Sequence, residues 1–183
     1  MGGPVLYSFI RLLQGDDKRT LTDLYNLNLR PYIERGQAFS ASGRASIDAA
    51  ESLGFYFENP SGSGKNVFMI IITVRGTAKG DLDIYDKVSV TTPGTQINPR
   101  NLNLGSTNTS VCYIEYGGTY NISSAIPVKV DVLPGGSKIR AVGDAAEVGE
   151  SIMLPPGTSV LVVITNTSTD TARYAVSFLW IEV

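Results

Sequence analysis

The chain of 183 residues contains no histidine and a single cysteine, Cys112. Without histidine there can be no Ser-His-Asp triad, no Cys-His pair and no histidine-bound zinc or haem. One cysteine allows neither an internal disulfide nor a cysteine-cluster metal site. Because Cys112 lies between Val111 and Tyr113 in an apolar run, we expect a buried, unreactive thiol rather than a nucleophile. The sequence therefore predicts a protein that is not an enzyme and holds no cofactor.

Charged residues are also few. Asp, Glu, Lys and Arg make up 17% of the chain and its net charge is −2, whereas soluble domains average about 25% charged residues. A protein that binds nucleic acid would carry a basic surface, so no nucleic-acid partner is expected. The first apolar run is short, contains Arg11 and is not followed by a small-residue cleavage site. We therefore expect neither a signal peptide nor a membrane span.

The chain is rich in residues that favour turns and strands, most clearly between Leu53 and Arg75. Two apolar runs, Leu53 to Phe57 and Val67 to Val74, flank the polar residues 58–66. The runs are rich in aromatic and β-branched residues, which suit a pleated surface, and the residues between them favour turns. We predict two antiparallel strands joined as a hairpin by a wide polar loop.

The Gly-Ser-Gly-Lys sequence at 62–65 in this loop is not a phosphate-binding loop. That motif needs a Gly and a Ser or Thr where Asn59 and Asn66 stand, and a helix should follow it. Here a strand-like run follows instead.

Apolar runs separated by turn signals continue to the end of the chain. Their number predicts roughly eight to ten strands, and no helical pattern interrupts them after Leu53. Gly117-Gly118 is expected to form a two-residue hairpin turn, with its partner strand beginning at Thr119. Antiparallel chains of this kind close as sandwiches, jelly rolls or barrels. The predicted fold is all-β, an antiparallel jelly-roll-like β-sandwich with an N-terminal arm.

Residues 1–36 carry nine of the chain's charges and precede the strand pattern. Four apolar residues share one face at helical spacing, namely Leu6, Phe9, Ile10 and Leu13. We predict an arm or docking segment over 1–36 and a β-sandwich domain over 37–183. An additional helix and strand packed on the same core would account for the segment equally well. The long polar stretch 95–109 is of a length that usually serves a function or an interface.

Several stretches carry a family likeness. The string GFYFENPSGSGKNVFMIIITV at 54–74 resembles the leading hairpin of small β-sandwich structural proteins of tailed phages and some archaeal viruses. TPGTQINPRNLNLGSTNT at 92–109 is similar to their loop of threonine, proline and paired asparagines, and LPPGTSVLVVITNTS at 154–168 to their Pro-Gly-Thr turn. The segment 33–40 also resembles theirs, so the likeness spans about residues 33–183.

This resemblance implies a virion structural protein: a capsid- or tail-associated spike, turret, fibre head or decoration subunit. It implies self-association, often as a homotrimer, packing on other virion proteins, and assembly in a host cytoplasm. Contact with a receptor or glycan on the host surface would fit a fibre head. No catalytic residue comes with the likeness. The scarcity of thermolabile residue types (one Cys, three Met) is typical of a hot habitat, here that of a thermophilic virus.

A carbohydrate-binding module is the alternative function. Tyr113, Tyr116, Tyr120 and Trp180 could form an aromatic sugar-binding platform, although residues 113 and 116 should lie on opposite faces of a strand. Asp81, Asp83 and Asp86 could offer oxygen ligands to calcium, but the turn Gly and final Glu of a calcium loop are missing, so a solvated strand edge is expected. Three Asn-x-Ser/Thr sequences, at Asn108, Asn121 and Asn166, match the glycosylation signal. Chance matches are expected, and glycosylation on the particle surface of an archaeal virus is the alternative.

The loops 59–66, 95–109 and 166–171 are expected to be presented outward. The residues predicted to be exposed and to form the interaction surface are Asn59, Pro60, Gly62, Gly64, Lys65, Asn98, Arg100, Asn103, Asn108, Tyr116 and Asn166.

Overall fold

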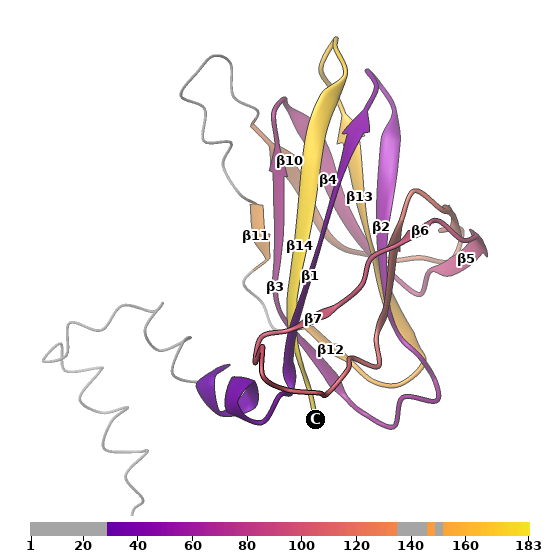
Figure 1. Cartoon of the computed structure of the whole chain (residues 1–183). Helices are drawn as coiled ribbons and strands as arrows, with labels where there is room; N and C mark the ends of the chain where they lie inside the picture. Colours follow the sequence, from indigo (N-terminus) through magenta and orange to yellow (C-terminus); the bar gives the residue numbers. More distant parts are fainter. Residues whose placement is uncertain (1–28, 135–145, 149–151) are drawn as a thin grey trace, which may run out of the picture.

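Antiparallel strands make up most of the molecule (Figure 1). The computed structural model describes residues 29–134, 146–148 and 152–183. The strands within these ranges are β1 (Ala38–Ile47), β2 (Ser52–Asn59), β3 (Val67–Gly76), β4 (Gly80–Asp86), β5 (Ser89–Thr92), β6 (Thr95–Gln96), β7 (Arg100–Asn101), β8 (Tyr113–Tyr116), β9 (Thr119–Asn121), β10 (Pro127–Leu133), β11 (Ala146–Val148), β12 (Ile152–Leu154), β13 (Thr158–Asn166) and β14 (Ala172–Glu182). The all-β prediction is confirmed.

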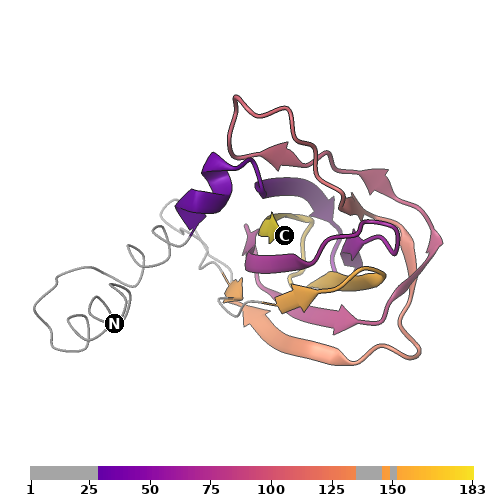
Figure 2. The same cartoon turned by 90° about the horizontal axis from the view of Figure 1, so that it is seen from below.

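The strands form two six-stranded sheets and one small ribbon. Sheet A has the order β11-β3-β14-β1-β7, with β12 also paired to β3, and sheet B has the order β10-β4-β13-β2-β8-β6. Strands β5 and β9 pair only with each other. Seen along the strands, the two sheets face each other as separate layers, and neither closes on itself (Figure 2).

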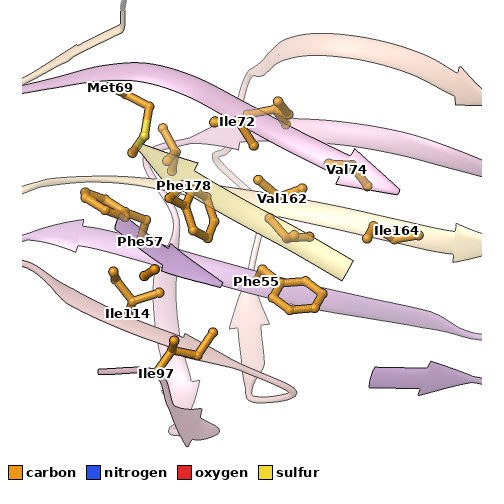
Figure 3. Packing of buried hydrophobic residues seen from close by; sticks show 14 of the residues in the cluster. Phe55, Phe57, Met69, Ile72, Val74, Ile97, Ile114, Val162, Ile164 and Phe178 are labelled. Carbon is orange, nitrogen blue, oxygen red and sulfur yellow. The ribbon is translucent and has the colours of Figure 1, made fainter. Parts of the chain in front are cut away.

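The core between the sheets follows from alternation along the strands. In β14 the side chains of Tyr174, Val176, Phe178 and Trp180 are buried, and the residues between them are half exposed. Phe57 of β2 meets this row from the opposite sheet, with its ring 5.5 Å from that of Phe178 and 5.0 Å from that of Trp180. Apolar side chains from both sheets fill the space between them (Figure 3). This buried layer holds the two sheets together.

Strand pairing is nested along the chain. The first long strand pairs with the last, β1 with β14, and the second with the second last, β2 with β13. Inside these, β3 pairs with β12 and β4 with β10. All four pairs are antiparallel, so residues distant in sequence supply most of the sheet contacts.

Two predicted hairpins are wrong. β2 and β3 lie in different sheets, so residues 60–66 cross from sheet B to sheet A. Both edges of β2 are already occupied, by β13 and β8. Gly117-Gly118 does not join a hairpin either, because β8 pairs with β2 and β6 while β9 pairs with β5. The glycines allow a close backbone crossing instead: a Cβ on Gly118 would lie 2.6 Å from the carbonyl oxygen of Thr92.

A short helix over residues 29–34 covers part of the outer face of sheet A. Leu29 packs there with Ala38 and Ile181, and half-buried Tyr32 and Ile33 lie beside them. The last residues of the predicted arm are therefore docked on the strand domain. The helical face expected at Leu6 to Leu13 lies outside the described residues.

The outer face of sheet B carries a different cover, made by the β5–β9 ribbon and the residues beside it. Val88 packs there on Tyr56 and Leu161, and the ring of Tyr120 stacks on that of Tyr56 at 5.7 Å. Each sheet is thus covered on part of its outer face.

Phe57→Ala tests the packing between the sheets. The change removes a buried ring that contacts two other rings, so the free energy of unfolding should fall by about 3–5 kcal/mol. Leu104→Ala is the control, because Leu104 is 93% exposed and its loss should change stability by no more than about 0.5 kcal/mol. Urea denaturation followed by circular dichroism measures both; equal effects would contradict the assignment of the core.

Candidate functional site

One end of the molecule gathers two of the three loops that the sequence predicts to be presented outward, 59–66 and the later part of 95–109. Residues 60–66 and 102–112 meet there with the helix over 29–34 and the end of β14. Asn66 and Val183 exchange backbone hydrogen bonds of 2.8 and 3.0 Å, and the Glu182 N–H donates to the Gln37 carbonyl at 2.9 Å. The loops are therefore fixed to the last residues of the strand domain.

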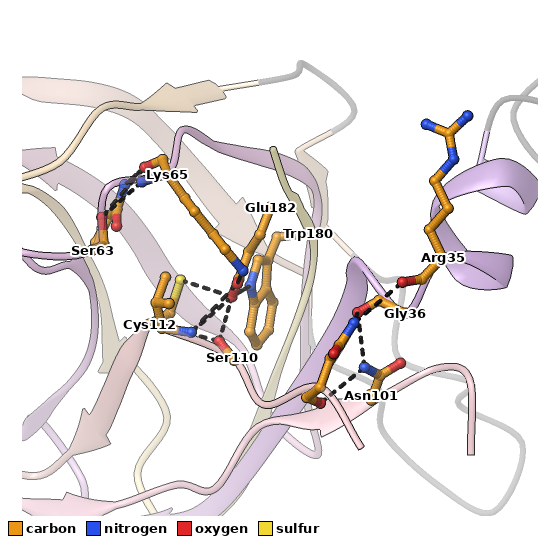
Figure 4. Close-up of polar contacts among 12 residues, drawn as sticks. Arg35, Gly36, Ser63, Lys65, Asn101, Ser110, Cys112, Trp180 and Glu182 are labelled. Carbon is orange, nitrogen blue, oxygen red and sulfur yellow. Dashed lines mark hydrogen bonds and ion pairs between the residues drawn. The ribbon is translucent and has the colours of Figure 1, made fainter. Parts of the chain in front are cut away.

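At the centre of this end lies Glu182, whose side chain is fully buried. Its carboxylate accepts hydrogen bonds from Ser110 Oγ at 2.6 Å, from the Val111 N–H at 3.1 Å and from Trp180 Nε1 at 3.2 Å. Lys65 Nζ lies 3.1 Å from the second carboxylate oxygen and supplies the countercharge. Figure 4 shows these donors converging on Glu182 from three segments. A buried carboxylate with this many donors is a structural anchor, since its lone pairs are occupied.

Cys112 belongs to the same cluster. Its Sγ lies 3.6 Å from Glu182 Oε1. Burial and the adjacent carboxylate of Glu182 raise the pKa of the Cys112 thiol well above its ordinary value. The thiolate is the reactive form of cysteine, so the prediction of a buried, unreactive thiol agrees with this geometry.

Three asparagines of the long polar loop dock the segment that follows the helix. The amide of Asn101 donates to the Gly36 carbonyl at 3.0 Å, that of Asn103 to the Glu34 carbonyl at 3.3 Å, and that of Asn108 to the Arg35 carbonyl at 3.2 Å. Side-chain amides thus satisfy the carbonyl groups at the end of the helix, which have no partner within it. The paired asparagines of this loop attach the helix to the strand domain.

The structure separates the predicted surface residues into three groups. Gly62, Gly64, Asn98, Arg100 and Asn108 are exposed, as expected, and Pro60, Lys65, Asn103 and Tyr116 are half-buried. Asn59 and Asn166 are fully buried, so the prediction that these two are exposed is wrong. The loop 166–171 also lies at the end of the molecule opposite the other two (Figure 1). The predicted surface is therefore not one patch.

The side-chain amides of the two buried asparagines bond to backbone carbonyl groups where the chain leaves a strand. Asn59 donates to the carbonyls of Lys65 and Leu154, both at 2.8 Å. Asn166 donates to the carbonyls of Ile47 and Asp170, both at 2.9 Å, and accepts from Tyr174 Oη at 3.1 Å. Because an unpaired buried carbonyl is costly, these amides are structural. Burial of Asn166 also removes its sequon as a modification site in the folded chain.

The predicted aromatic platform is not assembled. Trp180 is fully buried between the sheets. Tyr116 packs toward the core, stacked on Phe55 at 5.6 Å, whereas Tyr113 joins the outer cluster of sheet B. Residues 113 and 116 thus lie on opposite faces of β8, as their spacing predicts.

A second buried carboxylate lies near these tyrosines. Glu115 is fully buried and accepts from Tyr113 Oη at 2.6 Å and from the Gly94 N–H at 3.0 Å. The hydrogen bond to Glu115, followed by burial, raises the pKa of Tyr113 to about 12.

Within the described ranges no cluster of three or more His, Cys, Asp or Glu side chains could hold a metal ion. Asp81 and Asp83 lie along β4, and Asp86 accepts a hydrogen bond from the Ile126 N–H at 3.2 Å. In the same part of the chain, no helix is long and apolar enough to cross a membrane.

The anchor Glu182 was not among the predicted residues. A signal for it exists: Phe178 and Trp180 alternate inward along β14, and the same period of two places Glu182 on the inward face. A glutamate that continues a row of inward-facing side chains is expected to have a buried carboxylate, and a buried carboxylate needs hydrogen-bond donors.

A scan against models of protein families and a search of curated proteins found no match to this chain.

Glu182→Gln tests the anchor. The substitution keeps the shape but places an amide N–H₂ among groups that donate, so the free energy of unfolding should fall by about 3 kcal/mol. Lys65→Met is the comparison: the Lys65 side chain is 39% exposed but that of Glu182 is fully buried, so removing the countercharge while the neutral donors remain should cost about 1–3 kcal/mol. Chemical denaturation measures both variants. A larger loss for Lys65→Met would mean that the ion pair, not the neutral donors, carries the anchor.

The raised pKa of Tyr113 predicts how stability depends on alkaline pH. The folded state holds the phenol proton to about pH 12, whereas the unfolded tyrosine loses it near pH 10. The folded state therefore binds more protons in this window, and stability should fall as pH rises from about 10 to about 12. Tyrosinate absorbance during a pH titration follows the ionisation. Glu115→Gln should lower the pKa of Tyr113, because it removes the charged acceptor; an unchanged titration would exclude Glu115 as the cause.

Proposed function

We propose that this chain is a non-enzymatic virion structural protein built on a jelly-roll β-sandwich. The observation that carries the proposal is the nested strand order. A jelly roll is a double sheet of eight strands, and it recurs in viral capsid proteins and lectins. Here β1, β2, β3, β4, β10, β12, β13 and β14 pair from the outside inward, first with last. When one long hairpin folds over so that its strand pairs divide between two sheets, the strands pair in this nested order.

The loop end supports a packing role. Its polar side chains are used to fix loops and the 29–34 helix: Glu182 anchors the loops, and Asn101, Asn103 and Asn108 hold the end of the helix. Rigid, well-bonded loops suit a subunit that packs repeatedly against the same neighbours. In this proposal the protein self-associates and packs on other virion proteins, with the exposed positions Gly62, Gly64, Asn98 and Arg100 on its outward surface.

The carbohydrate-binding alternative has less support in the geometry. Of its four aromatic residues, Tyr113 and Tyr120 lie together, half-buried, in the cluster on the outer face of sheet B. Tyr116 lies on the opposite face of β8, and Trp180 is not accessible to a sugar. The four side chains therefore do not form one platform.

The experiment is to detect the chain in particles. Antibodies raised against the recombinant protein should label virions purified through a density gradient, and mass spectrometry of the same fraction should find its peptides in fixed proportion to the major capsid protein. A non-structural protein of the same virus, present in the infected cell but absent from the particles, is the control. The proposal fails if the chain is abundant in infected cells but absent from the particle fraction.

A further inference from the structure

Strand β10 forms one margin of sheet B. It pairs with β4 along one side, and no strand in the described part of the chain pairs with its other side. Figure 2 shows β10, in light orange, on the outer rim of the molecule. An unpaired strand edge presents free backbone N–H and C=O groups that can pair with another strand.

The side chains of β10 are arranged unusually for an exposed strand. Val128, Val130 and Val132 are 48%, 69% and 65% exposed. They alternate with Lys129 and Asp131, which lie opposite the buried Ile84 and Leu82 of β4 and hence on the other face. Exposed apolar side chains gathered on one strand indicate an interaction surface.

Backbone geometry shows which residues face the free edge. The N–H of Val132 bonds to the carboxylate of the preceding residue, Asp131, at 2.9 Å, so it is not used by β4. In an antiparallel strand the N–H and C=O of one residue point to the same side, and successive residues alternate. The outward groups of β10 therefore belong to Val130 and Val132, whereas Val128 lies at the irregularity in the β4 pairing, where this alternation is interrupted.

The sequence Val128-Lys129-Val130-Asp131-Val132 is complementary to itself in the antiparallel direction. When two copies pair with Val130 opposite Val130, each Lys129 faces an Asp131 and each Val128 faces a Val132. Val130, whose backbone groups face outward, takes the hydrogen-bonded position at the axis. Lys129 and Asp131 take the positions without hydrogen bonds, where opposed side chains lie closer together. Opposite charges at facing positions stabilise a strand pair.

We propose that β10 pairs antiparallel with β10 of a second copy of this chain, around a two-fold axis at Val130, and joins the two B sheets into one. We infer that the partner strand is β10 of a second copy, because its Lys129 and Asp131 place opposite charges at the facing positions. Parallel pairing places Lys129 against Lys129, and an antiparallel shift of two residues places like charges together at the axis. Inward-facing charges normally protect an edge against pairing. Here they oppose pairing with a strand that lacks the matching charges and permit it with the same strand.

The proposal does not depend on the virion role, and it gives a two-fold contact rather than the three-fold one implied by the family resemblance. A two-fold contact uses the same residues on both copies. In the single chain Lys129 and Asp131 pair with each other at 3.2 Å. Dimerisation exchanges these two ion pairs, one in each copy, for two equivalent pairs between the copies.

A charge-swap experiment on the full chain tests the proposal. Lys129→Asp makes the edge wholly acidic and Asp131→Lys makes it wholly basic, so each variant alone should weaken dimerisation about tenfold or more. Mixed together, the two variants should form a heterodimer. The double variant, Lys129→Asp with Asp131→Lys, should dimerise like the original chain. Light scattering after size exclusion, over a range of protein concentrations, measures the mass in each case.

Lys79→Asp is the matched control, because it makes the same change of charge at an exposed residue just before β4 and should leave the dimer unchanged. Circular dichroism establishes that each variant is folded. Amide hydrogen exchange of the original chain is an independent measurement: the N–H group of Val130 should become protected as concentration rises. A monomer at every concentration, or an oligomer that none of the charge changes affects, would overturn the proposal.

Discussion

The loop end of the molecule depends on one buried carboxylate. Removing a carboxylate from water costs several kcal/mol even after the protein relaxes. The side chain of Glu182 is held in the interior only because Ser110, Val111, Trp180 and Lys65 all direct donors to it. Backbone bonds such as those between Asn66 and Val183 also fix these loops, and the shared carboxylate joins them to each other and to β14. The Asn101 and Asn108 contacts to the helix-to-strand junction then follow from the position of the same loop.

The sequence was informative where burial repeats with a local period. Alternation in β14, and the apolar runs of β2 and β3, identified strands that the structure contains. The sequence was not informative about which strands pair with each other. The spacing of Phe55 and Phe57 indicates that one face of β2 is buried. The apolar residues Met69, Ile72 and Val74 indicate the same for β3. Neither pattern indicates whether the two strands share a sheet. Pairing in this fold links residues such as Phe57 and Val160, and no local pattern encodes that distance.

The misplaced asparagines show the same difference between burial and partners. Asn59 and Asn166 precede turn formers, which is the composition of an exposed loop. The period of two nevertheless places both inward, Asn59 after Phe57 and Asn166 after Ile164, as it places Glu182 after Trp180. Each of the three is the last residue of its strand, and its burial was predictable in principle. The carbonyl groups that satisfy the two amides, here those of Leu154 and Ile47, come from segments distant in sequence and were not predictable.

The position of β14 has a consequence for how the protein is made. Synthesis proceeds from β1 onward, but β1 and β3 are held in one sheet only through β14, which lies between them. Until residues 172–182 have left the ribosome exit tunnel, sheet A lacks its central strand and the core lacks Phe178 and Trp180. The nascent chain therefore carries its apolar strands, β3 and β13 among them, without their final cover until β14 emerges. Cellular factors that hold unfolded chains can bind these strands until β14 completes sheet A.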